Sequence, residues 1–108
     1  MRSGSGSIRV ELRAEARNDL VSAAMFYARQ SPGLDDYFLD CLQSDLKLLE
    51  STAGIHEKYY GLYRTLSSRF PFAIYYLFKD DLIDVVAILD CRQDPEKTDA
   101  RIIRTIVL

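Results

Sequence analysis

The stretch RFPFAIYYLFKDDLIDVVAILDCRQDP, residues 69–95, decides the fold. It contains two apolar runs, Phe70–Phe78 and Leu82–Leu89, which are rich in the aromatic and β-branched residues that favour strands. The polar link between them, residues 79–81, is short enough to make the two strands antiparallel neighbours. The sequence therefore predicts a buried hairpin whose second strand ends at a polar cluster, residues 90–95.

Upstream of this hairpin, the periodicity of apolar residues predicts one strand, two helices and a further strand. Residues 8–12 alternate apolar and charged side chains, as in a strand with one wet face. Residues 14–30 and 34–51 carry apolar residues at helical spacing, with Ser31-Pro32-Gly33 between them, and so predict an antiparallel helical hairpin. Residues 58–67 indicate one strand that joins the sheet.

These elements predict an α+β fold with an N-terminal strand, an antiparallel two-helix hairpin and then a three-stranded antiparallel sheet. Both helices would cover one face of the sheet, leaving the opposite face open, concave and available to a partner. The tail, residues 102–108, fits a short helix by its spacing and a strand by its β-branched content. Residues 1–7 have no apolar block and are expected to be a flexible or added leader, so residues 8–108 form the single predicted domain.

Composition sets further limits. The chain has 108 residues, of which 48% are hydrophobic and 28% charged, as in one soluble globular domain. Its apolar runs are strand-length, so no membrane span is expected, and no export signal is visible, which favours the cytoplasm. A net charge of -2 does not imply attraction of the whole molecule to nucleic acid. Cys41 and Cys91 match no metal-ligand spacing, and we expect neither a metal nor a cofactor.

Three short motifs are more specific than the rest of the chain: RFPFAIYY (69–76), VVAIL (85–89) and the strand exit RQDP (92–95). With the order of the elements, they resemble the ParE/RelE superfamily of toxins from bacterial type II toxin–antitoxin systems, often labelled plasmid stabilisation proteins. The resemblance covers residues 8–95, and the first and last motifs look closer to ParE than to RelE.

This resemblance implies a small cytoplasmic toxin that a cognate antitoxin holds inactive, as a homodimer or as a heterotetramer with the antitoxin. ParE-type members poison DNA gyrase, whereas RelE-type members cut mRNA on the ribosome with basic residues on the concave sheet face. We expect this protein to inhibit DNA gyrase, and to do so by protein binding. Two alternatives stay open, namely a ribosome-dependent endoribonuclease and a degenerate homologue without toxicity, which the low pI of 5.3 favours.

Arginines and outward tyrosines are the expected contact residues, because arginine suits desolvated pairing with carboxylates and tyrosine is favoured in interfaces. The expected partner-binding residues are Arg64, Arg69, Tyr75, Arg92, Arg101 and Arg104. In the ribonuclease alternative, two of these, Arg64 and Arg92, would stabilise the charge that develops on the phosphate. The sequence does not fix the strand register, and with it the sheet face of Arg64.

Other polar residues have simpler interpretations. His56 is the only histidine and lies in a predicted loop, where a surface role is expected. Asp90, Asp94 and Glu96 crowd the strand exit, and oxygen ligands of this kind can bind a divalent cation. Solvated carboxylates are the favoured interpretation. No Ser/His/Asp or Cys/His constellation is supported, because nothing in the sequence fixes His56 near Cys41 or Cys91, so an enzyme is not the leading hypothesis.

Overall fold

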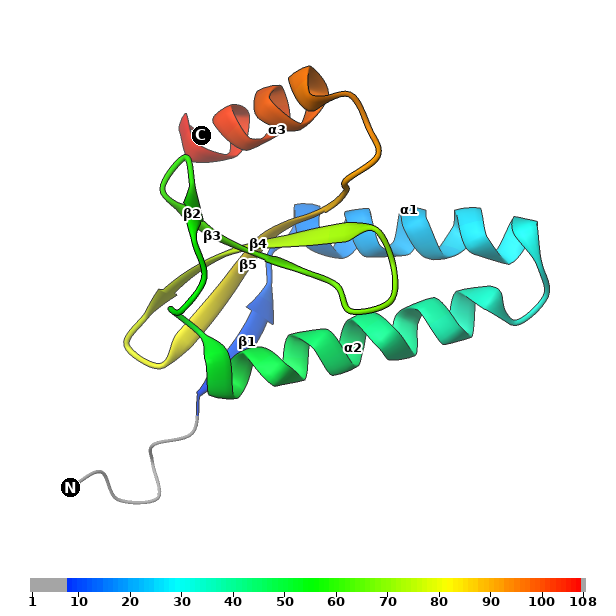
Figure 1. Cartoon of the computed structure of the whole chain (residues 1–108), viewed down its shortest axis with the longest axis horizontal. Coiled ribbons are helices and arrows are strands. Elements are labelled where there is room, and N and C mark those ends of the chain that lie inside the picture. Colours follow the sequence, from blue (N-terminus) through cyan, green and yellow to red (C-terminus); the bar gives the residue numbers. More distant parts are fainter. Residues whose placement is uncertain (1–7, 108) are drawn as a thin grey trace.

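The computed structural model describes residues 8–107, which form a five-stranded mixed sheet and three helices (Figure 1). The elements in chain order are β1 (Arg9–Leu12), α1 (Ala14–Gln30), α2 (Leu34–Thr52), β2 (Lys58–Tyr59), β3 (Leu62–Leu66), β4 (Phe72–Lys79), β5 (Leu82–Asp90) and α3 (Pro95–Val107). The strand order is β1-β5-β4-β3-β2, with β1 parallel to β5 and the other neighbours antiparallel. The α+β class is as expected. The predicted leader, residues 1–7, lies outside the described residues.

The β4–β5 hairpin forms the centre of the sheet, as the two apolar runs predicted. Both residues of its turn, Asp80 and Asp81, have positive φ (52° and 65°). This combination belongs to the type I′ turn, whose twist matches that of the flanking strands. The pairing continues along both strands and shifts once, at a β-bulge between Tyr75 and Tyr76.

The single strand predicted at residues 58–67 is wrong, because this segment is a second hairpin. The chain reverses at Tyr60 and Gly61, which both have positive φ (53° and 84°), so β2 pairs antiparallel with β3. Gly61 lacks the Cβ that disfavours the left-handed region, and it was the one sign of this turn inside an apolar run. The sheet therefore has five strands, and β1 joins it in parallel at the β5 edge.

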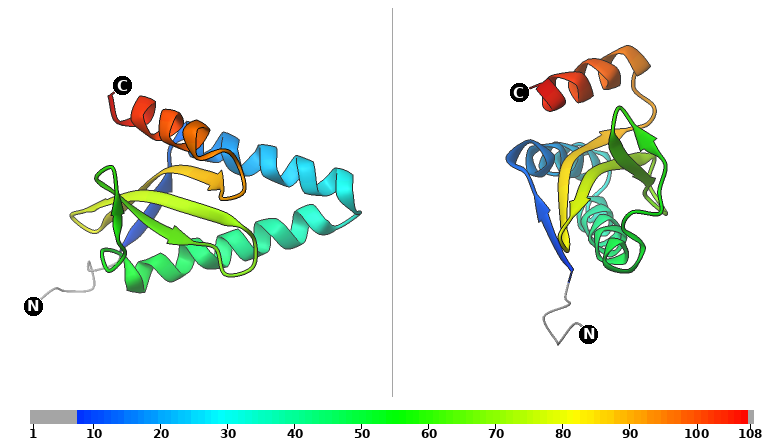
Figure 2. Two further views of the ribbon diagram at one scale, coloured as in Figure 1. Left: turned by 45° about the horizontal axis from the view of Figure 1, so that its top comes forward. Right: turned by 90° about the vertical axis from the view of Figure 1, so that its left-hand side faces the viewer.

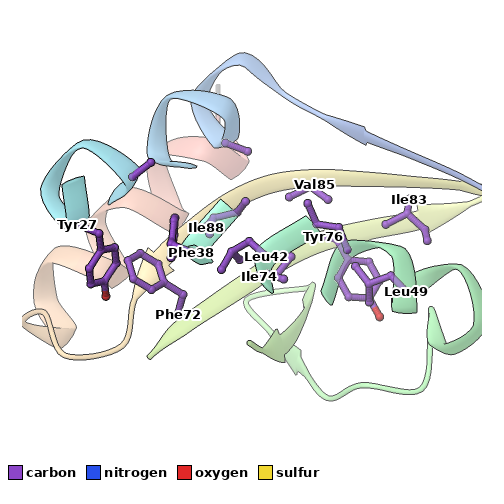
Figure 3. Packing of buried hydrophobic residues seen from close by; sticks show 13 residues of the cluster. Tyr27, Phe38, Leu42, Leu49, Phe72, Ile74, Tyr76, Ile83, Val85 and Ile88 are labelled. Carbon is purple, nitrogen blue, oxygen red and sulfur yellow. The ribbon is translucent and has the colours of Figure 1, made fainter. Parts of the chain in front are cut away.

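One face of the sheet is covered by the antiparallel helices α1 and α2, and the main core lies between these layers (Figures 2 and 3). Alternate residues of each central strand point to this side, because successive side chains of a strand face opposite ways. The fully or nearly buried members of the core include Ala16, Tyr27, Phe38, Leu42, Leu49, Phe72, Ile74, Tyr76, Ile83, Val85 and Ile88. This layer is the predicted helical hairpin, and both helices lie on one face of the sheet, as expected.

The opposite face is not bare, because the C-terminal helix α3 lies over it (Figures 1 and 2). Ile102 is fully buried there among outer-facing strand residues, which are Leu62, Ala73, Tyr75, Val86, Ala87 and Leu89. The expectation of an open concave face is therefore wrong where α3 lies. Of the two options for the tail, the structure has the helix, despite the β-branched residues in this segment. Pro95 suits a first helical turn, and Ile102 becomes fully buried in the helix.

The helices of residues 8–107 do not have the combination of length and apolar character that spanning a membrane requires.

Candidate partner-binding surface

Arg64 lies in the middle of β3 on the face that α3 partly covers. Its Nε donates a hydrogen bond to the Tyr75 hydroxyl at 3.2 Å, and its terminal nitrogen lies 3.9 Å from the Cys91 sulfur. The hydrogen bond to Tyr75 raises the pKa of Arg64 above its ordinary value, so the guanidinium stays charged. Arg64, Tyr75 and Cys91 line a hollow of about 220 Å³ beside the start of α3. The sequence did not decide which face of the sheet Arg64 occupies, and the structure places it on the outer face, the one that α3 partly covers.

Tyr75 does not project as an outward anchor, since only 2% of its surface is exposed. Its hydroxyl is engaged by Arg64, and its ring lies 5.9 Å from that of Tyr59. Tyr59 in turn donates its hydroxyl proton to the carboxylate of Asp99 on α3, and this hydrogen bond raises the pKa of Tyr59 to about 12. A tyrosine network therefore ties β2 and β4 to α3. Tyr75 is therefore too buried to contact a partner unless this network rearranges.

Arg92 lies on the other side of the strand exit. Its guanidinium donates to both carboxylate oxygens of Asp90, at 2.7 and 3.0 Å, and these bonds hold the pKa of Asp90 below its usual value. Arg92 lines a separate hollow of about 300 Å³, which lies between α1 and the end of β5. Arg64 and Arg92, paired in the ribonuclease alternative, thus line different hollows.

The remaining predicted contact residues are spread over the molecule. Arg101 forms a bidentate ion pair with Asp19 of α1, at 2.7 and 2.8 Å, and both side chains are largely buried. Arg104 is exposed and lines a cleft of about 220 Å³ together with Arg13 at the start of α1. Arg69 is exposed in the β3–β4 connection. Neither Arg69 nor Arg104 forms an ion pair with a described residue.

The structure also assigns partners to polar residues that sequence reasoning left in solvent. The Nδ1 of His56 forms a hydrogen bond with the Tyr76 hydroxyl, and burial lowers the pKa of His56. Asp45 of α2 accepts hydrogen bonds from the Ser67 and Ser68 hydroxyls and from the Ser68 N–H. The Ser67-Ser68 pair was the signal for this anchor.

The acidic strand exit has a structural use. Asp94 accepts a hydrogen bond from the Glu96 N–H at 2.9 Å, which caps the first turn of α3. Asp90 accepts from the backbone and side chain of Arg92. Within residues 8–107, no group of three or more His, Cys, Asp or Glu side chains is arranged to hold a metal ion.

The fold and these surfaces define a small α+β scaffold with several hollows that are lined in part by arginines. A solved structure with the same fold is a chain of the chromosomal ParDE TA system from P. aeruginosa, with a TM-score of 0.68 and 17% sequence identity over 77% of this chain and 95% of that chain. No curated protein sequence matches significantly. Residues 10–95 match the family of the ParE toxin of type II toxin–antitoxin system, parDE, so this chain belongs to the ParE toxin family.

Proposed function

We propose that this protein is the toxin of a type II toxin–antitoxin module, that a cognate antitoxin neutralises it, and that it acts by binding and inhibiting DNA gyrase. The family match over residues 10–95 is the observation that carries this proposal. The ParDE structure with the same fold is consistent with an antitoxin partner.

The distribution of arginines supports binding over catalysis. Arg64 and Arg92 line separate hollows, and Arg104 lines a third, so these cations do not converge on one reacting group. A phosphoryl transition state needs several preorganised donors around the same oxygens. Arginines dispersed over an area instead suit carboxylates on a protein partner, because the planar guanidinium pairs well with them at interfaces.

A supercoiling assay with purified gyrase tests the activity. We expect the protein to inhibit supercoiling, and we expect its cognate antitoxin to restore supercoiling in a dose-dependent way. The variant Arg69→Glu combined with Arg104→Glu should weaken inhibition about tenfold, because both side chains are exposed and free of ion pairs among the described residues. Lys47→Glu, an exposed charge on α2, is the matched control.

Two other results would contradict the proposal in different ways. Unimpaired supercoiling together with cleaved mRNA in a translation extract, abolished by Arg92→Ala, would make the protein a ribosome-dependent endoribonuclease. No effect in either assay, with tight binding of the cognate antitoxin, would make it a homologue that has lost toxicity.

A further inference from the structure

The two edges of the sheet differ in how well they are protected from pairing with another chain. One edge is β2, which has two residues and begins with Lys58, and both shortness and lysine discourage a further strand. The other edge is β1, and within residues 8–107 no strand pairs with its side away from β5. Strand β1 has no proline or lysine, its register with β5 is unbroken, and it lies at the border of the sheet in the right-hand view of Figure 2.

The backbone of β1 presents hydrogen-bonding groups to this free edge. The N–H of Arg9 donates to a carbonyl of the β4–β5 turn at 2.9 Å, and the N–H of Arg13 donates to the carbonyl of Val85 at 3.0 Å. Successive residues of a strand direct their backbone groups to opposite sides. The N–H and C=O groups of the alternate residues 8, 10 and 12 therefore point away from β5, toward any further strand.

The side chains of residues 8–12, in the order Ile-Arg-Val-Glu-Leu, are complementary to their own reverse. Two copies set antiparallel around Val10 would place Arg9 of each opposite Glu11 of the other, and Ile8 opposite Leu12. Val10 would face its own counterpart as a hydrogen-bonded pair, because its backbone groups point outward. The Arg9–Glu11 pairs would be of the closer, non-hydrogen-bonded kind, with about 4.5 Å between Cα atoms. Opposite charges in such cross-strand pairs are stabilising.

The charges also exclude the neighbouring registers. An antiparallel pairing centred on Arg9 would place two arginines opposite each other, and one centred on Glu11 would do the same with two glutamates. Like charges directly opposite each other are destabilising. Glu11 has a further reason to accept an arginine, since its neighbour on β5 is another carboxylate, that of Asp84. The register centred on Val10 is therefore the one that this strand favours with itself.

The apolar side of β1 would gain from the same pairing. Ile8, Val10 and Leu12 pack against the main core but are only half-buried, whereas Ile83 and Val85 of the neighbouring strand β5 are fully buried. An antiparallel pair of edges has its two-fold axis perpendicular to the sheet, so both helical layers would lie on the same side and the two cores would meet. The interface is isologous, so it closes at a dimer whose outer edges are the short β2 strands.

We propose that two copies of this chain pair antiparallel through β1, centred on Val10, into one continuous sheet of ten strands, five from each copy. An edge this short buries less than about 1,200 Å² in total, so we expect a dissociation constant in the micromolar range. This inference does not depend on the proposed function.

Sedimentation equilibrium of the full-length protein, from micromolar to near-millimolar concentration, measures the dimer. Arg9→Glu and Glu11→Arg should each weaken dimerisation about tenfold or more, because each places like charges opposite each other twice. The double variant Arg9→Glu with Glu11→Arg restores both pairs and should return to within about threefold of the wild-type dissociation constant. Lys47→Glu, which reverses an exposed charge on α2, is the control and should stay within about twofold.

A mixture of the two single variants gives an independent readout. One carries two glutamates and the other two arginines at these positions, so a heterodimer should form where each variant alone is mainly monomeric. The side chains of Arg9 and Glu11 are 65% and 57% exposed, and circular dichroism verifies that each variant is folded. Hydrogen exchange locates the contact, since protection of residues 8–12 should grow with the concentration of the wild-type protein.

Four results would overturn the inference. The first is a wild-type protein that stays monomeric at the highest concentration. The second is a dimer whose affinity neither single variant changes, because its interface would then lie elsewhere. The third is a double variant and a mixture that both fail to recover dimerisation, since charge matching would then not set the register. The fourth is protection of residues 8–12 that appears only when the cognate antitoxin is added, which would assign this edge to that protein.

Discussion

Asp19 joins three elements that are far apart in the sequence. Its carboxylate accepts a hydrogen bond from the Ile88 N–H of β5 at 3.0 Å and pairs with Arg101 of α3, while the residue itself belongs to α1. The exposed fractions of the Asp19 and Arg101 side chains are only 13% and 17%. Asp19 therefore satisfies a strand N–H beyond the end of β1, and it also anchors α3. The two charged residues are 82 positions apart, so no local pattern could predict the pair.

We expect Asp19→Ala to lower the free energy of unfolding by about 3 kcal/mol, because it leaves a largely buried guanidinium and a strand N–H without their acceptor. Urea unfolding followed by circular dichroism measures this change. Arg9→Ala, which breaks an exposed pair with Glu11, should stay within about 0.5 kcal/mol of the wild type. The double variant Asp19→Ala with Arg101→Met should recover part of the loss, and a loss equal to the sum of the two single changes would contradict a direct pair.

His56 makes stability depend on pH near neutrality. Burial lowers its pKa below the ordinary value of 6.5, so the folded protein favours the neutral ring, which is hydrogen-bonded to the Tyr76 hydroxyl. A group whose pKa is lower when folded stabilises the fold fully above its unfolded pKa, and this contribution is lost as the pH falls. We expect the free energy of unfolding to decrease between about pH 7.5 and about pH 5.5, and to decrease less in His56→Gln. Identical pH profiles for the two proteins would show that His56 has no such role.

At the scale of elements, the helices and strands with a strong apolar periodicity were predicted correctly, because the same spacing is needed to pack them in the core. The central hairpin and the two long helices carry apolar residues at the spacing of their own structure, and local preference and burial agree there. The second hairpin was missed because Tyr60-Gly61 is not one of the usual turn pairs, and the apolar residues continue on both sides of it. The tail could not be assigned because its β-branched residues favour a strand, while burial of Ile102 and the cap from Asp94 select a helix.

We expect Gly61→Ala to destabilise the fold by about 1 kcal/mol, because φ at this residue is +84° and a Cβ there is disfavoured. The added methyl group meets no atom within 4 Å, so the cost is conformational and not steric. Thermal unfolding measures the change, and Gly61→Asn should lose less than Gly61→Ala, since asparagine tolerates the left-handed region. Equal losses for alanine and asparagine would indicate that the turn relaxes to another geometry.

At the scale of the whole molecule, the sequence predicted that the two long helices cover one face of the sheet, but not that α3 covers part of the other. The arginines proposed for binding were selected from the sequence by residue type alone. Their distribution among separate hollows could not be predicted, because it depends on the strand register and on the path of α3. The hollow that Arg92 lines could not have been predicted from the sequence, because it combines residues from α1, β4, β5 and the strand exit.

The parallel pairing of β1 with β5 has a consequence for folding during synthesis on the ribosome. Arg9 is the partner of Leu82, so β1 cannot pair in the sheet until 73 more residues have been synthesised. At about 5 to 20 residues per second, this delay is roughly 4 to 15 seconds on the ribosome. During that interval the apolar side of β1 has no sheet to join. The nascent chain therefore cannot present a complete sheet until β5 has been synthesised.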